Sequence, residues 1–120
     1  MNAKELVLDF YNSDALYNPV TLNGFLHNDI LLNWNSSKGF VIKNKEELIQ
    51  LATDLQSNYT SHVIQIHQVV AEANLVTVHY THFATTIENP NHIHILAHFM
   101  VIWEVENDTL YKGYQMSQQP

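Results

Sequence analysis

The second half of the chain decides the fold: residues 62–117 read HVIQIHQVVAEANLVTVHYTHFATTIENPNHIHILAHFMVIWEVENDTLYKGYQMS. Val, Ile, Thr, Tyr and Phe are frequent here, and apolar residues tend to alternate with polar ones, which is typical of β-strands. The breaks between the apolar runs are short, as hairpin turns require. The stretch therefore predicts a meander of antiparallel strands over 62–70, 75–87, 93–105 and 110–117.

The first half of the chain has the apolar spacing of helices instead. Asn18 is a candidate N-cap, and Pro19 follows it at the first helical position. Asn44 is a second candidate N-cap, and Glu47 three residues later completes the pattern of a capping box. The predicted helices cover residues 3–11, 18–29 and 44–56, with a short strand at 30–34 and a strand or extended segment at 40–42. Helices followed by a sheet predict an α+β domain.

The hairpin lengths also predict which strand residues share a face. We take Val70 to lie opposite Leu75, and Ile87 opposite His92. The more apolar face, which we expect to contact the helices, is then Val63, His67, Val69, Val76, Val78, Tyr80, His82, Ile93, Ile95, Ala97, Phe99, Val101 and Trp103. The outer face is His62, Ile64, Ile66, Thr77, His79, Thr81, Phe83, His94, Leu96, His98 and Met100. Because the outer face is still half apolar, we expect it to form a homodimer with twofold symmetry.

The composition argues against several classes of function. The 120 residues carry a formal net charge of −7, and the five basic residues are all lysine. Nucleic acids and anionic membrane surfaces need a positive footprint that this chain lacks. The absence of cysteine excludes disulfides, thiolate catalysis and cysteine zinc sites. No apolar run approaches the ~20 residues of a membrane span, and the N-terminus has no signal-peptide pattern, so we expect one cytoplasmic domain over residues 1–120.

Three segments resemble a known family when they are taken in order. They are Phe25–Ile30 (FLHNDI), Lys45–Ile49 (KEELI) and Val101–Asp108 (VIWEVEND). Together with the order of elements, they resemble the nuclear transport factor 2-like superfamily, which includes ketosteroid isomerases and SnoaL-like polyketide cyclases. The resemblance implies a cystatin-like cone, in which three N-terminal helices pack on a strongly curved mixed or antiparallel sheet around a central pocket.

The same resemblance implies positions for catalytic groups, and the chain departs from the family there. The carboxylate base of the isomerases matches a position near Trp34, and their donor in the first helix matches Leu6. Their protonated acid matches a position near Phe99 or Val101, and the aspartate of the cyclases matches a position close to Gln115. None of these side chains can do the same work. The sequence therefore predicts the scaffold without the known catalytic sets.

An aromatic lining and eight histidines remain as candidates. The predicted ligand-binding residues are Trp34, Tyr80, His82, Phe99, Val101, Trp103 and Gln115, with plain core packing as the alternative. A histidine among aromatic residues suits general acid–base chemistry, so His82 and His67 are candidate catalytic residues; structural, hydrogen-bonded histidines are the alternative. His92 and His94 point the same way on a strand, about 6.6 Å apart, and form a candidate metal pair if a third ligand joins them.

We therefore expect a homodimeric domain that holds a small, mostly apolar molecule, without a cofactor and without nucleic-acid or membrane partners. Two alternatives stay open at this point. One is an isomerase-like or SnoaL-like enzyme that uses histidine as its acid or base. The other is a metal-binding protein that uses His92 and His94.

Overall fold

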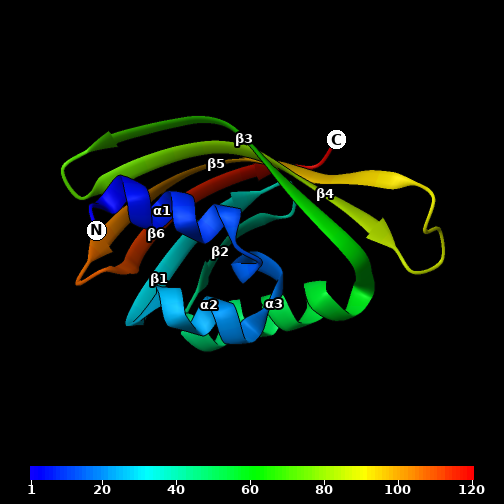
Figure 1. Ribbon diagram of the computed structural model, residues 1–120, viewed down its shortest axis with the longest axis horizontal. Helices are drawn as coiled ribbons and strands as arrows, with labels where there is room; N and C mark the ends of the chain where they lie inside the picture. The colour runs from blue at the N-terminus through cyan, green and yellow to red at the C-terminus, as the bar shows by residue number, and fades with distance from the viewer.

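The computed structural model covers residues 1–120 and has helices first and a sheet after them (Figure 1). The helical elements are α1 (Ala3–Asn12), the 3₁₀ helix η1 (Ala15–Tyr17), α2 (Pro19–Phe25) and α3 (Lys45–Asn58). The strands are β1 (Leu26–Ser36), β2 (Gly39–Lys43), β3 (Tyr59–Glu72), β4 (Leu75–Thr86), β5 (Ile93–Glu106) and β6 (Thr109–Gln118). They form one six-stranded sheet in the order β2-β1-β6-β5-β4-β3. Only β1 and β6 are parallel, so the fold is α+β with a mixed sheet, as predicted.

The predicted helix starts are confirmed by their hydrogen bonds. The side chain of Asn18 accepts a hydrogen bond from the backbone N–H of Val20 at 3.1 Å, and Pro19 opens α2. The side chain of Asn44 accepts from the N–H of Glu47 at 3.0 Å. The carboxylate of Glu47 accepts in return from the N–H of Asn44 at 3.0 Å, which completes the capping box. These bonds satisfy backbone donors that a helix start leaves free.

The end of α2 differs from the prediction. The helix ends at Phe25 rather than near residues 27–29, and β1 begins at Leu26. Leu26 pairs with Leu110 of β6, and the pairing is then irregular until Leu31. The parallel partner strand, which is distant in sequence, therefore extends β1 into residues that resembled a helix end.

The sheet curves over the helices (Figure 1). α1 runs along the concave side of the long strands, and α2 and α3 lie on the same side, with α3 against β1 and β2. The hairpin of β4 and β5 projects beyond the helices. One cluster of 16 buried residues, from the helices and the concave face, forms the core. None of the helices combines the length and the apolar content that crossing a bilayer requires.

The predicted pairing of the strands was partly right. If Ile87 pairs with His92, continuing the same register along the two strands places Tyr80 opposite Phe99. The structure has this pair. Val70 pairs with Thr77 and not with Leu75, because only two residues separate β3 from β4.

Several predicted faces were wrong because two β-bulges interrupt the strands. The first lies between Ile66 and Gln68 of β3. It puts Ile64 and Ile66 against the core, whereas the side chain of His67 reaches Thr81 on the outer face. The residues of β3 whose predicted face is exchanged are His62, Val63, Ile64, Ile66 and His67.

The second bulge is in β5: Ala97 pairs with His82 and Ile95 pairs with Phe83, so Leu96 between them is the extra residue. This bulge exchanges the two faces of β5 for the residues before it. Leu96, predicted on the outer face, lines the cavity described below, and His94 pairs with the buried Ala84. Ile93 and Ile95, predicted to face the helices, are exposed. A bulge inserts one residue into one strand, and the alternation of faces is reversed beyond it.

Candidate functional site

A cavity of about 540 Å³ lies between the concave face of the sheet and the helices. Its volume is in the range of small-molecule sites. Of the 24 residues that line it, 16 are hydrophobic. The helices contribute Phe10, Leu16, Leu22, Leu48, Leu51 and Leu55, and the strands contribute Leu26, Leu32, Trp34, Val41, Tyr59, Tyr80, Leu96, Ala97, Phe99 and Trp103. The polar lining residues are Ser36, Ser37, Lys38, Lys43, His82, Gln115, Ser117 and Gln119.

Six of the seven residues predicted to bind a ligand line this cavity: Trp34, Tyr80, His82, Phe99, Trp103 and Gln115. The seventh, Val101, is 1% exposed and belongs to the core. The aromatic rings among them contact one another: Tyr80 stacks on Phe99 with ring centroids 4.7 Å apart and planes 8° apart. The ring of Trp34 is tilted against that of Phe99, with centroids 6.3 Å apart. The structure therefore gathers the predicted aromatic lining into one wall.

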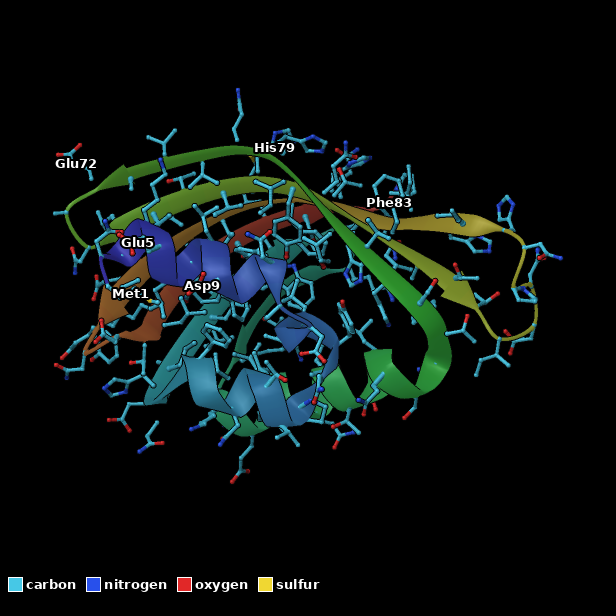
Figure 2. The ribbon with its side chains drawn as sticks, in the orientation of Figure 1. Met1, Glu5, Asp9, Glu72, His79 and Phe83 are labelled. Carbon is cyan, nitrogen blue, oxygen red and sulfur yellow. The ribbon has the colours of Figure 1, made fainter.

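The remaining histidine candidates lie away from the cavity. His67, predicted to face the helices, lies on the opposite face, where its Nε2 is 2.8 Å from Oγ1 of Thr81. His79 lies on the same outer side of the sheet (Figure 2). His92 and His94 have ring centroids 4.3 Å apart near the end of the projecting hairpin. No group of three or more His, Asp or Glu side chains is placed to hold a metal ion.

A buried polar network supports the aromatic wall. Nε1 of Trp103 donates a hydrogen bond to Oη of Tyr11 at 2.8 Å, which ties β5 to α1. Burial raises the pKa of Tyr11, and burial together with the neighbouring Tyr11 raises the pKa of Tyr80. Both phenols therefore stay protonated and neutral. Farther along the wall, Nε1 of Trp34 donates to Oγ of Ser117 at 2.8 Å and orients the indole ring across β1 and β6.

His82 belongs to a chain of hydrogen bonds that the sequence did not predict. Its Nε2 is 2.9 Å from Nδ1 of His62, and Nε2 of His62 is 3.1 Å from the backbone oxygen of Leu55 in α3. The ring of Tyr17 stacks on His62, with centroids 4.2 Å apart and planes 11° apart. The helical layer thus holds His62, and His62 holds His82.

The direction of these hydrogen bonds follows from the carbonyl at their end. The oxygen of Leu55 can only accept, so Nε2 of His62 must carry a proton. In a neutral His62, Nδ1 is then an acceptor, so Nε2 of His82 must donate. In a neutral His82, the proton on Nε2 leaves Nδ1 unprotonated. The network therefore assigns one tautomer to each ring.

Both rings are neutral near pH 7. Burial, with a further contribution from the charge of His62, lowers the pKa of His82 to about 4. Burial also lowers the pKa of His62. All enclosed side-chain nitrogens and oxygens have hydrogen-bond partners. His82 lines the cavity, and its Nε2 is used in the bond to His62. Nδ1 of His82 has no hydrogen-bond partner in the protein and is not enclosed, so it is the ring nitrogen that is free to bind a ligand.

Sequence reasoning missed His62, and one signal in the sequence points to it. The apolar residues of β3 that pack against the core are Ile64, Ile66 and Val69. Ile64 and Ile66 are two residues apart, whereas Ile66 and Val69 are three apart, and this change of spacing marks the bulge. Alternation counted back from Val69 therefore assigns His62 to the wrong face. The leucines of α3 in the lining have the spacing of a buried helix face, and only the three-dimensional arrangement distinguishes a lining position from a packed one.

Comparison with known proteins shows which solved structures share this fold. No protein-family model matches the chain, and no curated protein matches its sequence. The structure is similar to that of IdmH, a candidate polyketide cyclase from Streptomyces antibioticus, with a TM-score of 0.78 at 11% identity over 98% of this chain and 92% of that one.

Two further solved structures are similar to the structure of this chain. A candidate SnoaL-like polyketide cyclase from Shewanella denitrificans has a TM-score of 0.73 at 11% identity, over 96% of this chain and 89% of that one. An LEH-like epoxide hydrolase from M. tuberculosis has a TM-score of 0.72 at 18% identity, over 96% of this chain and 81% of that one. Identities this low establish the fold and leave the activity open. The chain therefore has the nuclear transport factor 2-like cone fold.

Proposed function

We propose that the protein binds a small, mostly apolar molecule in the cavity of the cone. The observation that carries this proposal is the cavity itself: about 540 Å³, lined by 16 hydrophobic residues out of 24. An apolar surface that is concave and partly supported by hydrogen bonds is the usual form of a small-molecule site. Proteins of similar structure include an epoxide hydrolase and candidate cyclases, whose names also imply small organic substrates.

The charged groups of the lining favour binding over the known chemistry of the family. The only charged lining residues are Lys38 and Lys43, although the chain carries 12 acidic residues. Trp34 and Gln115 stand near the positions where the resemblance implies catalytic carboxylates. The family's carboxylate-dependent mechanisms therefore have no group to start from in this cavity.

We further propose that the outer sheet face pairs with a second copy of the chain. Among the exposed apolar side chains of this face are five, on the neighbouring strands β1, β6 and β5, that are at least 43% exposed: Leu31, Met100, Ile102, Tyr114 and Met116. We call them the outer apolar patch. Met100 lies opposite Met116 and Ile102 opposite Tyr114 in the β5–β6 ladder, so four of the five are contiguous. Apolar patches of this kind mark protein interfaces, and twofold pairing is the commonest way to cover one.

Binding is tested with fluorescent bicyclic probes. We expect 2-methylnaphthalene or 2-naphthol to bind saturably, one molecule per chain, and to quench tryptophan fluorescence. Ala97→Trp fills the cavity opposite His82 and should abolish this binding. Ala71→Trp places the same side chain at an exposed position of β3 and serves as the matched control. If neither probe binds saturably, or if Ala97→Trp binds them as the wild type does, the proposal fails.

Acid–base catalysis by His82 is the second candidate function. The unprotonated Nδ1 at the cavity and the hydrogen bond that orients the ring from behind favour it. A positioned imidazole of this kind accelerates proton transfer by ~10²–10⁴. For any turnover that is found, His82→Ala should reduce kcat by a factor in this range, and His67→Ala, on the other face of the sheet, should leave it unchanged. Equal rates in both variants would exclude this role.

A further inference from the structure

The hydrogen-bond chain from Leu55 through His62 to His82 constrains the chemistry of the ligand. It runs in one direction, because the carbonyl of Leu55 at its end can only accept. Nε2 of His82 donates to Nδ1 of His62 on β3, and Nε2 of His62 donates to the carbonyl oxygen of Leu55 in α3. The nitrogen left without a partner is Nδ1 of His82, which carries a lone pair. The chain therefore presents a hydrogen-bond acceptor to the cavity.

No other polar group of the lining has this restriction. The lysine ammonium groups only donate, and the serine hydroxyls and glutamine amides both donate and accept. These groups belong to Ser36, Ser37, Lys38, Lys43, Gln115, Ser117 and Gln119. Nδ1 of His82 accepts and cannot donate while the hydrogen bonds from His82 to His62 and from His62 to Leu55 are intact. A ligand atom next to it must therefore carry a proton, since a buried polar group without a partner costs ~1–3 kcal/mol.

The surroundings narrow the kind of donor. A cationic donor such as an ammonium group would be repelled by Lys38 and Lys43, and no lining carboxylate compensates its charge. A carboxylate or a ketone has no proton to offer at neutral pH. The low pKa of His82 keeps the proton on the donor, so the contact is a neutral hydrogen bond. A hydroxyl group on an apolar body meets all these conditions.

We propose that the cavity selects neutral apolar alcohols or phenols, whose hydroxyl group donates to Nδ1 of His82. This inference rests on the proposed binding function and adds the class of ligand to it. His82 is the contacting residue, and His62 is a positioning residue that holds the ring and its tautomer from the side of the helices.

The test compares two probes of the same shape, 2-naphthol and 2-methylnaphthalene. The quantity measured is the ratio of their dissociation constants, methyl over hydroxyl, in the wild type and in His82→Phe. Phenylalanine keeps an aromatic ring and removes the acceptor. The ratio should fall about 3- to 10-fold in His82→Phe, which is the effect of a typical neutral hydrogen bond. Taking the change in the ratio removes the different hydrophobicity of the two probes.

The outcomes separate this inference from the binding function. If both probes bind and the ratio is the same in His82→Phe, the cavity binds apolar molecules and the hydroxyl preference is wrong. If neither probe binds the wild type, the proposed function itself fails, and the inference falls with it. The expected result is binding of both probes with a preference that depends on His82.

A second measurement uses the wild-type protein alone and stays decisive if His82→Phe does not fold. The ¹⁵N NMR signals of the imidazole rings distinguish protonated from unprotonated nitrogens. We expect Nδ1 of His82 to be unprotonated at pH 7, and its signal to shift on addition of 2-naphthol but not of 2-methylnaphthalene. A protonated Nδ1, or the same response to both probes, would overturn the inference.

The role of His62 has its own readout in the same spectra. His62→Phe keeps the stacking on Tyr17 but removes the acceptor for Nε2 of His82, so the His82 signals should move toward a mixture of tautomers. His62→Gln retains one acceptor and one donor and should restore a single tautomer. If His82 keeps a single tautomer in His62→Phe, His62 has no positioning role.

Discussion

Gly113 of β6 lies directly between the side chains of Trp103 and Leu32. It pairs with Trp103 of β5 on one side and with Leu32 of β1 on the other. A Cβ atom at Gly113 would stand 2.6 Å from Cζ3 of Trp103 and 2.6 Å from Cδ1 of Leu32. The indole ring that lines the cavity therefore occupies the space that any other residue at position 113 would need.

Gly113→Ala should lower the free energy of unfolding by about 1–3 kcal/mol, the usual cost of overpacking. Urea unfolding monitored by circular dichroism measures this change. Gly24→Ala is the matched control, because a Cβ at Gly24 meets nothing within 4 Å and alanine is favoured in a helix by up to about 1 kcal/mol. Equal stability of Gly113→Ala and the wild type would show that Trp103 can move aside.

Tyr11→Phe should also destabilise the protein. The substitution leaves Nε1–H of the buried Trp103 without its acceptor, and an unpaired buried donor costs about 1–3 kcal/mol. Tyr111→Phe keeps the ring that packs against His27 and removes a hydroxyl that forms no hydrogen bond, so it should be nearly neutral. Chemical unfolding of both variants gives the comparison. A loss in Tyr11→Phe no larger than in Tyr111→Phe would contradict the assigned hydrogen bond.

Stability should fall as the pH decreases from about 6.5 to about 4. The pKa of His82 is about 4 in the folded protein, below the 6.5 of a histidine exposed to water, so in this interval the unfolded chain binds a proton that the folded protein does not. The stability lost from this group is roughly 3 kcal/mol. His82→Leu should flatten the dependence of the urea midpoint on pH over the same interval. An equally steep dependence in the variant would assign it to other groups.

The proposed dimer predicts a specific effect of charge on the outer apolar patch. The wild type should have twice the mass of the 13.9 kDa chain in multi-angle light scattering. Ile102→Glu places a charge at the centre of the patch and should produce monomers, since a buried unpaired charge is costly. Val20→Glu, at an 82% exposed position of α2, should leave the mass unchanged. A monomeric wild type would rule out the dimer.

Local signals in the sequence predicted most elements of the fold. The capping residues Asn18 and Asn44 act within three residues of themselves, so they mark the helix starts without any tertiary contact. The four long strands were also located correctly, because alternation of apolar residues is a local pattern. By contrast, η1 and the start of β1 at Leu26 were missed, since Leu26 depends on pairing with Leu110, far along the chain.

The candidate site was predicted only in part, for a similar reason. Trp34, Tyr80 and Phe99 were placed on the right face because no bulge separates them from the core positions of their strands. His62 and Leu96 were placed on the wrong face: His62 lies beyond the bulge of β3, and Leu96 is itself the extra residue of the bulge in β5. A bulge depends on how two strands meet, which one strand's own pattern does not specify.

The amino-acid sequence by itself determined the α+β class, the order of helices and strands, and the aromatic character of one sheet face, because caps, turns and alternation act over a few residues. Only the tertiary structure decided that these aromatic residues surround a cavity rather than a solid core, and that His62 lies behind His82. Whether side chains fill a space depends on the curvature of the sheet and the position of the helices. Both arise from contacts between residues far apart in the chain, such as Gly113 with Leu32 and His62 with His82.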